Sequence, residues 1–157
     1  MDSVFVLWFL CIPFLVFLLL ISLFDLRHYM IPDSLILAIA GLGGFRMLST
    51  RDFFSPLFGA LLLFGVFLLL HLLSPEGMGF GDVKFAGAIG FFLGWRLGLL
   101  ATLLSFFAGG FVGALLVLLR RKTMKDPLPF GPFLAFGAAL SFLFGEEVIA
   151  WYLGIWM

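Results

Sequence analysis

The sequence predicts an all-α fold, a polytopic membrane helical bundle of about six transmembrane helices. Of its 157 residues, 64% are hydrophobic and 11% are charged, whereas a soluble domain is about 45–50% apolar and about 25% charged. The longest apolar runs reach the roughly 20 residues that a spanning helix needs. They lack the alternation of polar and apolar residues that is typical of barrel strands. A soluble domain is therefore excluded, and the net charge of +0 gives no indication of a nucleic-acid partner.

Six segments are expected to form helices within a single membrane-embedded domain, 1–157. Their ranges are 4–24, 34–48, 54–73, 83–95, 97–119 and 132–156. The first, third and fifth are long and uninterrupted, while the second and fourth are short. The sixth carries Glu146 and Glu147, so its apolar part is expected to stop early, and five spans remain an alternative. The first run follows Asp2 and exceeds the roughly 7–15 apolar residues of a signal peptide, so we expect it to be retained as a span.

The basic residues predict the orientation, because cytoplasmic loops carry an excess of Lys and Arg. With an external N-terminus, the connections 25–33, 74–82 and 120–131 are cytoplasmic. Six basic residues belong to that side and three to the other: Arg27, Lys84, Arg120, Arg121, Lys122 and Lys125 against Arg46, Arg51 and Arg96. The tract 120–125 supplies most of the difference, and it is also expected to meet anionic lipid.

Two acidic residues stand at the edges of apolar segments. Asp25 directly follows the first apolar run, and Asp82 directly precedes the fourth. Both belong to the predicted cytoplasmic side, so a bundle can bring them together. Two carboxylates that share one site hold one proton between them, and can activate a water and polarise a peptide carbonyl. Alternatively, the two carboxylates cap helices in water, or serve as proton sites of a small transporter.

Glycines surround the second aspartate, in the order Gly79, Phe80, Gly81, Asp82. Glycine allows positive φ and a close approach of the backbone to a substrate. Gly79 and Gly81 are therefore expected to support the site. The alternative is that Asp82 is a simple helix N-cap, where a carboxylate is favoured by unpaired amides.

Three strings resemble a known family. Residues 25–33 read DLRHYMIPD, residues 79–84 read GFGDVK and residues 129–135 read PFGPFLA. Together they are similar to segments of the type IV prepilin peptidases, which are Gly-x-Gly-Asp membrane aspartyl proteases. The resemblance implies that Asp25 and Asp82 are the two catalytic aspartates of an intramembrane-type endopeptidase. It also implies that the chain lies in the bacterial inner membrane and cuts short leaders from prepilin or pseudopilin precursors at the cytoplasmic face.

The chain differs from many members of this family in one respect. Many members also methylate the new N-terminus through a segment with two Cys-x-x-Cys pairs, but Cys11 is the single cysteine here. We therefore expect a peptidase without methyltransferase activity in this chain. No cofactor is expected, and the rival functions are a non-enzymatic assembly factor of a pilus or secretion system and a small proton-coupled transporter.

The neighbours of the two aspartates have predicted roles of their own. Asp33 is expected to cap the second helix rather than to act in catalysis. Lys84 is expected to pair with Asp82 or with the substrate, or to remain a solvated interfacial lysine. Glu76 is a candidate contact for the basic leader. His28 and His71 have no plausible partners for a metal, so no metal site is expected.

Overall fold

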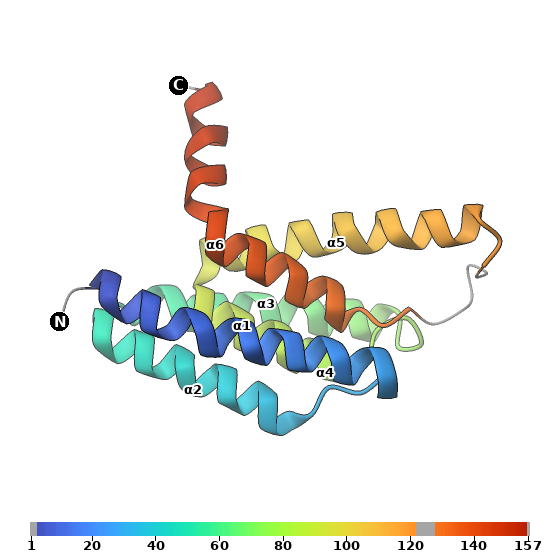
Figure 1. The fold of residues 1–157 in the computed structure, drawn as a ribbon, viewed down its shortest axis with the longest axis horizontal. Helices are drawn as coiled ribbons and strands as arrows, with labels where there is room; N and C mark the ends of the chain where they lie inside the picture. The colour runs from blue at the N-terminus through green and yellow to red at the C-terminus, as the bar shows by residue number, and fades with distance from the viewer. Residues whose placement is uncertain (1–2, 122–127, 157) are drawn as a thin grey trace.

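The computed structural model describes residues 3–121 and 128–156, and gives side chains for 9–121 and 128–154. These residues form six α-helices and no strand, and consecutive helices run in opposite directions (Figure 1). In chain order the helices are α1 (Ser3–His28), α2 (Asp33–Thr50), α3 (Phe54–Leu73), α4 (Phe80–Leu93), α5 (Trp95–Leu118) and α6 (Gly131–Trp156). The ends of α1, α3 and α5 therefore lie beside the starts of α2, α4 and α6. The predicted all-α bundle is confirmed.

Two helix bounds near the aspartates differ from the prediction. The first helix continues past residue 24 to His28, because nothing in 25–28 breaks it. It ends where Tyr29 adopts a φ of 53° and donates its N–H to the Asp25 carbonyl over 2.9 Å, the usual left-handed helix end. The fourth helix begins at Phe80 rather than residue 83, with Gly79 as its N-cap. Both aspartates therefore lie inside helices, not in the predicted loops.

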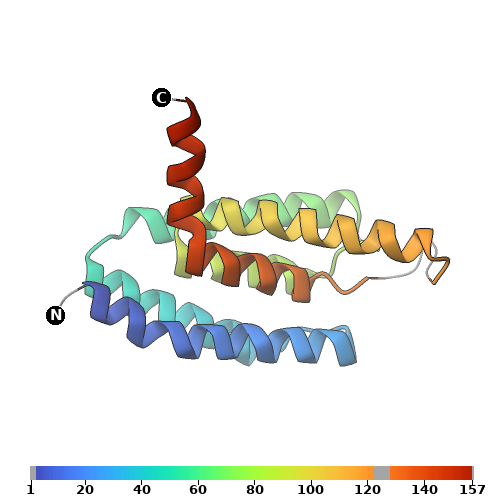
Figure 2. The same ribbon diagram turned by 45° about the horizontal axis from the view of Figure 1, so that its top comes forward.

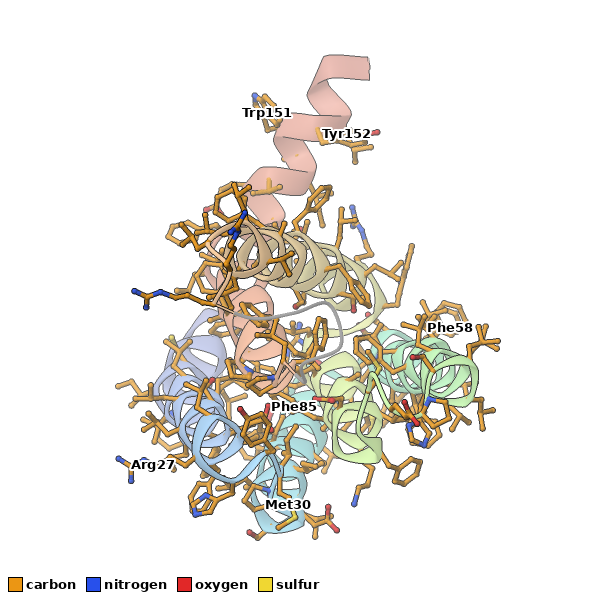
Figure 3. The ribbon with its side chains drawn as sticks, turned by 90° about the vertical axis from the view of Figure 1, so that its right-hand side faces the viewer. Arg27, Met30, Phe58, Phe85, Trp151 and Tyr152 are labelled. Carbon is orange, nitrogen blue, oxygen red and sulfur yellow. The ribbon has the colours of Figure 1, made fainter. Side chains whose placement is uncertain are left out.

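Four helices have the length and hydropathy of membrane spans. The matching stretches are Phe9–His28 of α1, Phe54–Leu73 of α3, Trp95–Leu118 of α5 and Gly131–Gly154 of α6. Among the described residues, α2 and α4 do not reach this standard. The short α4 instead forms the centre of the bundle, packed against α2, α3, α5 and α6. Its side chains Val83, Phe85 and Ile89 are fully buried, and Phe85 lies centrally in the end-on view of Figure 3.

Glycines allow α3 and α4 to touch backbone to backbone. A Cβ added to Gly90 would overlap the carbonyl oxygen of Gly59. Close contact through small residues is the main way in which helices associate in a membrane, where burial from water contributes little. On the fifth helix, Gly109 faces the side chain of Phe133 of α6, which would lie 3.5 Å from an added Cβ. This glycine thus serves packing within the chain.

The C-terminal part of α6 leaves the bundle. Figures 1 and 2 show that it turns away from the direction of the other helices. Glu146 and Glu147 are exposed, and Trp151 and Tyr152 lie on the part that projects (Figure 3). The apolar stretch of α6 runs past both glutamates to Gly154, so the prediction that it stops early is wrong.

Candidate functional site

Asp25 lies in the last turn of α1 but is held by the opposite end of the chain. Its side chain is 5% exposed, and its Oδ2 accepts a hydrogen bond of 2.9 Å from the backbone N–H of Gly131. Gly131 is the first residue of α6, where backbone N–H groups have no partner within the helix and favour a negative charge. The start of α6 therefore fixes the carboxylate of Asp25.

Gly131 has to be a glycine for this contact to form. A Cβ at this position would lie 2.5 Å from Oδ2 of Asp25 and 3.0 Å from its Cγ. The string 129–135 contains this residue, but sequence reasoning gave Gly131 no role. Only the packing of α1 against α6 brings the two residues together, since they are 106 positions apart.

Asp82 lies in the first turn of α4 and is 8% exposed. Its backbone N–H donates to the carbonyl of the N-cap residue Gly79 over 3.1 Å. Oδ1 of the side chain is buried and has no hydrogen-bond partner among the described residues. A buried oxygen without a partner costs free energy, so this oxygen is available to a water or a substrate.

Burial raises the pKa of Asp82 to about 7, with a further increase from the nearby charge of Asp25 and an opposing effect from a hydrogen bond with the Gly79 backbone. Asp82 stands outside the four apolar spans. Because its pKa is close to neutral, Asp82 can hold a proton near pH 7. The electrostatic effect of Asp25 also means that the two carboxylates act on each other.

One cavity of about 670 Å³ contains both aspartates. It is lined by the end of α1, the connection to α2 and the first turn of α4. The lining residues include every predicted site residue: Asp25, Asp82, Gly79, Gly81 and Lys84. Among the described residues, no group of three or more His, Cys, Asp or Glu side chains is placed to hold a metal ion. Of the three carboxylates in the lining, Asp33 is paired with Lys84, so Asp25 and Asp82 are the two left to take part in proton transfer.

The predicted role of Asp33 is wrong, and of the three alternatives for Lys84 the pairing with Asp82 is not observed. Asp33 does not cap α2, because Pro32 is the N-cap residue and the carboxylate of Asp33 pairs with the ammonium group of Lys84. Lys84 therefore does not pair with Asp82. The ion pair connects α4 to the start of α2, across 51 positions of sequence, and it is partly exposed. The pairing could not be predicted from the sequence, because it depends on the packing of α2 against α4.

The site glycines also differ from the prediction in their backbone. Gly79 has a φ of −70°, and among the described glycines only Gly94 has a positive φ. A Cβ would fit at both positions, at ordinary van der Waals distances. A Cβ at Gly79 would lie 3.6 Å from Oδ2 of Asp82, and one at Gly81 would lie 3.4 Å from the Cβ of Ile31. Both glycines therefore lie close to the cavity wall.

His71 fixes the segment that leads to Asp82, a role that sequence reasoning missed. Its Nδ1 lies 2.7 Å from the carbonyl oxygen of Met78. Since a carbonyl only accepts, Nδ1 has to carry the proton. The ring also lies beside Phe80, with 5.8 Å between ring centroids. Glu76, in the same connection, is exposed and does not line the cavity.

Comparison with known proteins identifies leader peptidases among the relatives of this chain. The family model of the type IV leader peptidase family matches residues 12–114. The prepilin leader peptidase/N-methyltransferase of Pseudomonas aeruginosa is 36% identical over 143 residues, which cover 87% of this chain and 49% of that protein. The protein of the same name from Bacillus subtilis is 31% identical over 144 residues, which cover 90% of this chain and 58% of that protein. The chain spans about half the length of such curated relatives, and no solved structure matches it.

Proposed function

Because the chain belongs to the type IV leader peptidase family, we propose that it is an aspartyl endopeptidase that removes the leader from prepilin or pseudopilin precursors. The observation that carries this proposal is the presence of Asp25 and Asp82 in one cavity. The relatives are also named as N-methyltransferases. The proposal covers the peptidase reaction alone, since the paired carboxylates provide chemistry for hydrolysis and not for methyl transfer.

The two carboxylates divide the reaction between them. The ionised carboxylate takes a proton from a water, whose oxygen attacks the carbonyl carbon of the scissile peptide bond. The protonated carboxylate donates a hydrogen bond to the carbonyl oxygen and then gives its proton to the leaving nitrogen as the C–N bond breaks, while the other carboxylate retains the proton taken from the water. With a pKa of about 7, Asp82 is the member that holds the proton. Asp25, fixed by the N–H of Gly131, is then the member that activates the water.

We place the reaction at the cytoplasmic face of the bacterial inner membrane. Arg27, Arg120 and Arg121 belong to the end of the bundle that carries both aspartates, whereas Arg51 and Arg96 belong to the other end. Excess positive charge marks the cytoplasmic side. Two further basic residues of the predicted tract, Lys122 and Lys125, lie outside the described residues. The precursor's own apolar helix would enter from the bilayer, with its cytoplasmic end near the cavity.

The test is processing of a co-expressed prepilin by Asp25→Asn and Asp82→Asn variants. Each substitution removes a carboxylate that the reaction needs, so each is expected to abolish cleavage while the protein remains in the membrane. The matched control is Asp52→Asn, because the exposed Asp52 precedes α3 and accepts a hydrogen bond from Ser55 N–H, which an asparagine oxygen can also accept. Full processing by either site variant contradicts the proposal.

The rival functions give different results in the same system. A non-enzymatic assembly factor predicts an unprocessed precursor with the parent protein and its variants alike. A proton-coupled transporter predicts proton flux in liposomes that depends on Asp25 and Asp82, without cleavage.

A further inference from the structure

A second cavity of about 510 Å³ adjoins the site, between α2, α3 and α4. Apart from Lys84 its lining is apolar. Ala40 of α2, Ala60 of α3 and Gly87 of α4 are small residues within it, and Phe64 of α3 contributes a wall. In Figure 3 the ribbons of α2 and α3 lie on different sides of α4, and both helices pack against it. We call this cavity the α2–α4 groove.

The groove adjoins the carboxylate cavity at one side chain. Lys84 lines both cavities, and its ion-pair partner Asp33 lines the first. Ile36, one turn along α2 from Asp33, lines the second. The Lys84–Asp33 ion pair therefore lies where the two cavities meet.

The groove opens at the level of the membrane. Leu57 and Leu61 line it and are 55% and 71% exposed, and both belong to the apolar span of α3. On α4 the lining runs from Lys84 to Phe91, a length of about 10 Å at 1.5 Å per residue. This length accommodates about two turns of a helix.

We propose that the α2–α4 groove seats the apolar helix of the precursor next to the scissile bond, an inference that rests on the proposed function. In the bilayer, a peptide backbone has to satisfy its own hydrogen bonds, so an apolar segment there is helical. Small residues such as Ala40, Ala60 and Gly87 permit the close approach by which helices associate in membranes. A lipid chain does not require such a surface, and it does not explain the connection to the carboxylates at Lys84.

The first experiment detects binding and does not depend on cleavage. A photoreactive benzophenone amino acid replaces Leu61 in the groove, or Leu19 of α1, which is 60% exposed and lines neither cavity. Both changes are made in the Asp25→Asn background, and the probe is a purified prepilin in liposomes. Capture is expected from position 61 and not from position 19, and it is lost when the prepilin lacks its apolar helix. Equal capture from both positions, or none from either, overturns the inference.

The second experiment compares two substrates. Ala40→Phe fills the groove, so kcat/KM is expected to fall roughly tenfold more for the whole precursor than for a peptide that has the scissile bond but no apolar helix. Gly41→Phe is the matched control, because an added Cβ at Gly41 meets nothing within 4 Å and the residue does not line the groove. Its ratio stays within about twofold of the parent's. An equal decrease in kcat/KM for both substrates contradicts the proposal that the groove binds the apolar helix.

The two proposals fail in different ways. Selective capture at position 61 by a parent protein that cleaves neither substrate refutes the peptidase and leaves a helix-binding groove. Normal cleavage with an unchanged substrate ratio in Ala40→Phe refutes the groove and leaves the peptidase.

Discussion

Replacing Gly131 by alanine changes one atom at the point where α6 holds Asp25. The added Cβ would lie 2.5 Å from Oδ2 and 3.0 Å from Cγ of that carboxylate, closer than real Cβ contacts allow. The carboxylate has to move, and the hydrogen bond of 2.9 Å from the Gly131 N–H is lost or lengthened. Since Asp25 belongs to the proposed catalytic pair, its displacement separates it from the water that it activates.

The size of the effect follows from the hydrogen bond that is lost. A hydrogen bond to a charged group contributes about 1.5–3 kcal/mol. If the bond is needed in the transition state, a tenfold loss of rate per about 1.4 kcal/mol gives a decrease in kcat of roughly ten- to 150-fold. KM is expected to change little, because Gly131 does not line the α2–α4 groove.

The assay is steady-state cleavage of a purified prepilin in detergent or liposomes, with kcat and KM measured separately. Gly110→Ala on α5 is the matched control, because an added Cβ there meets nothing within 4 Å. Thermal unfolding of both variants separates a local displacement of Asp25 from a general loss of folding. A Gly131→Ala protein with the parent's kcat refutes the assigned role of α6. The role is also refuted if the whole decrease in kcat is explained by a smaller fraction of folded protein.

Three further predictions concern pH, helix packing and the ion pair. Because the pKa of Asp82 is raised from 3.8 to about 7 in the folded protein, its contribution to stability is present below about pH 4, falls as pH rises from there, and is lost once pH passes 7. Asp82→Asn is thus expected to raise Tm relative to the parent well above pH 7 and not near pH 4. Gly90→Ala forces α3 and α4 apart and is expected to cost about 1–3 kcal/mol of unfolding free energy, measured against Gly65→Ala, whose added Cβ has open space. A double-mutant cycle on Lys84 and Asp33 is expected to give a coupling of about 0.2–1 kcal/mol that falls with salt. An unchanged Gly90→Ala or a salt-independent coupling would contradict the packing or the pair.

The sequence by itself determined the class of fold and the two aspartates that matter most to the proposal. Length and composition establish membrane helices because the cost of exposing polar backbone in lipid is a local property of each segment. The predicted range 54–73 agrees with α3 for the same reason. Asp25 and Asp82 were identifiable because each stands where an apolar segment begins or ends, and their place in one cavity agrees with that prediction.

Only the tertiary structure decided which residues act on these aspartates. The contact of Gly131 with Asp25 joins residues 106 positions apart, and the pair of Lys84 with Asp33 joins residues 51 apart. The α2–α4 groove likewise depends on three helices at once. None of these contacts follows from local sequence, because each depends on how the helices pack and on which small residues allow their backbones to meet.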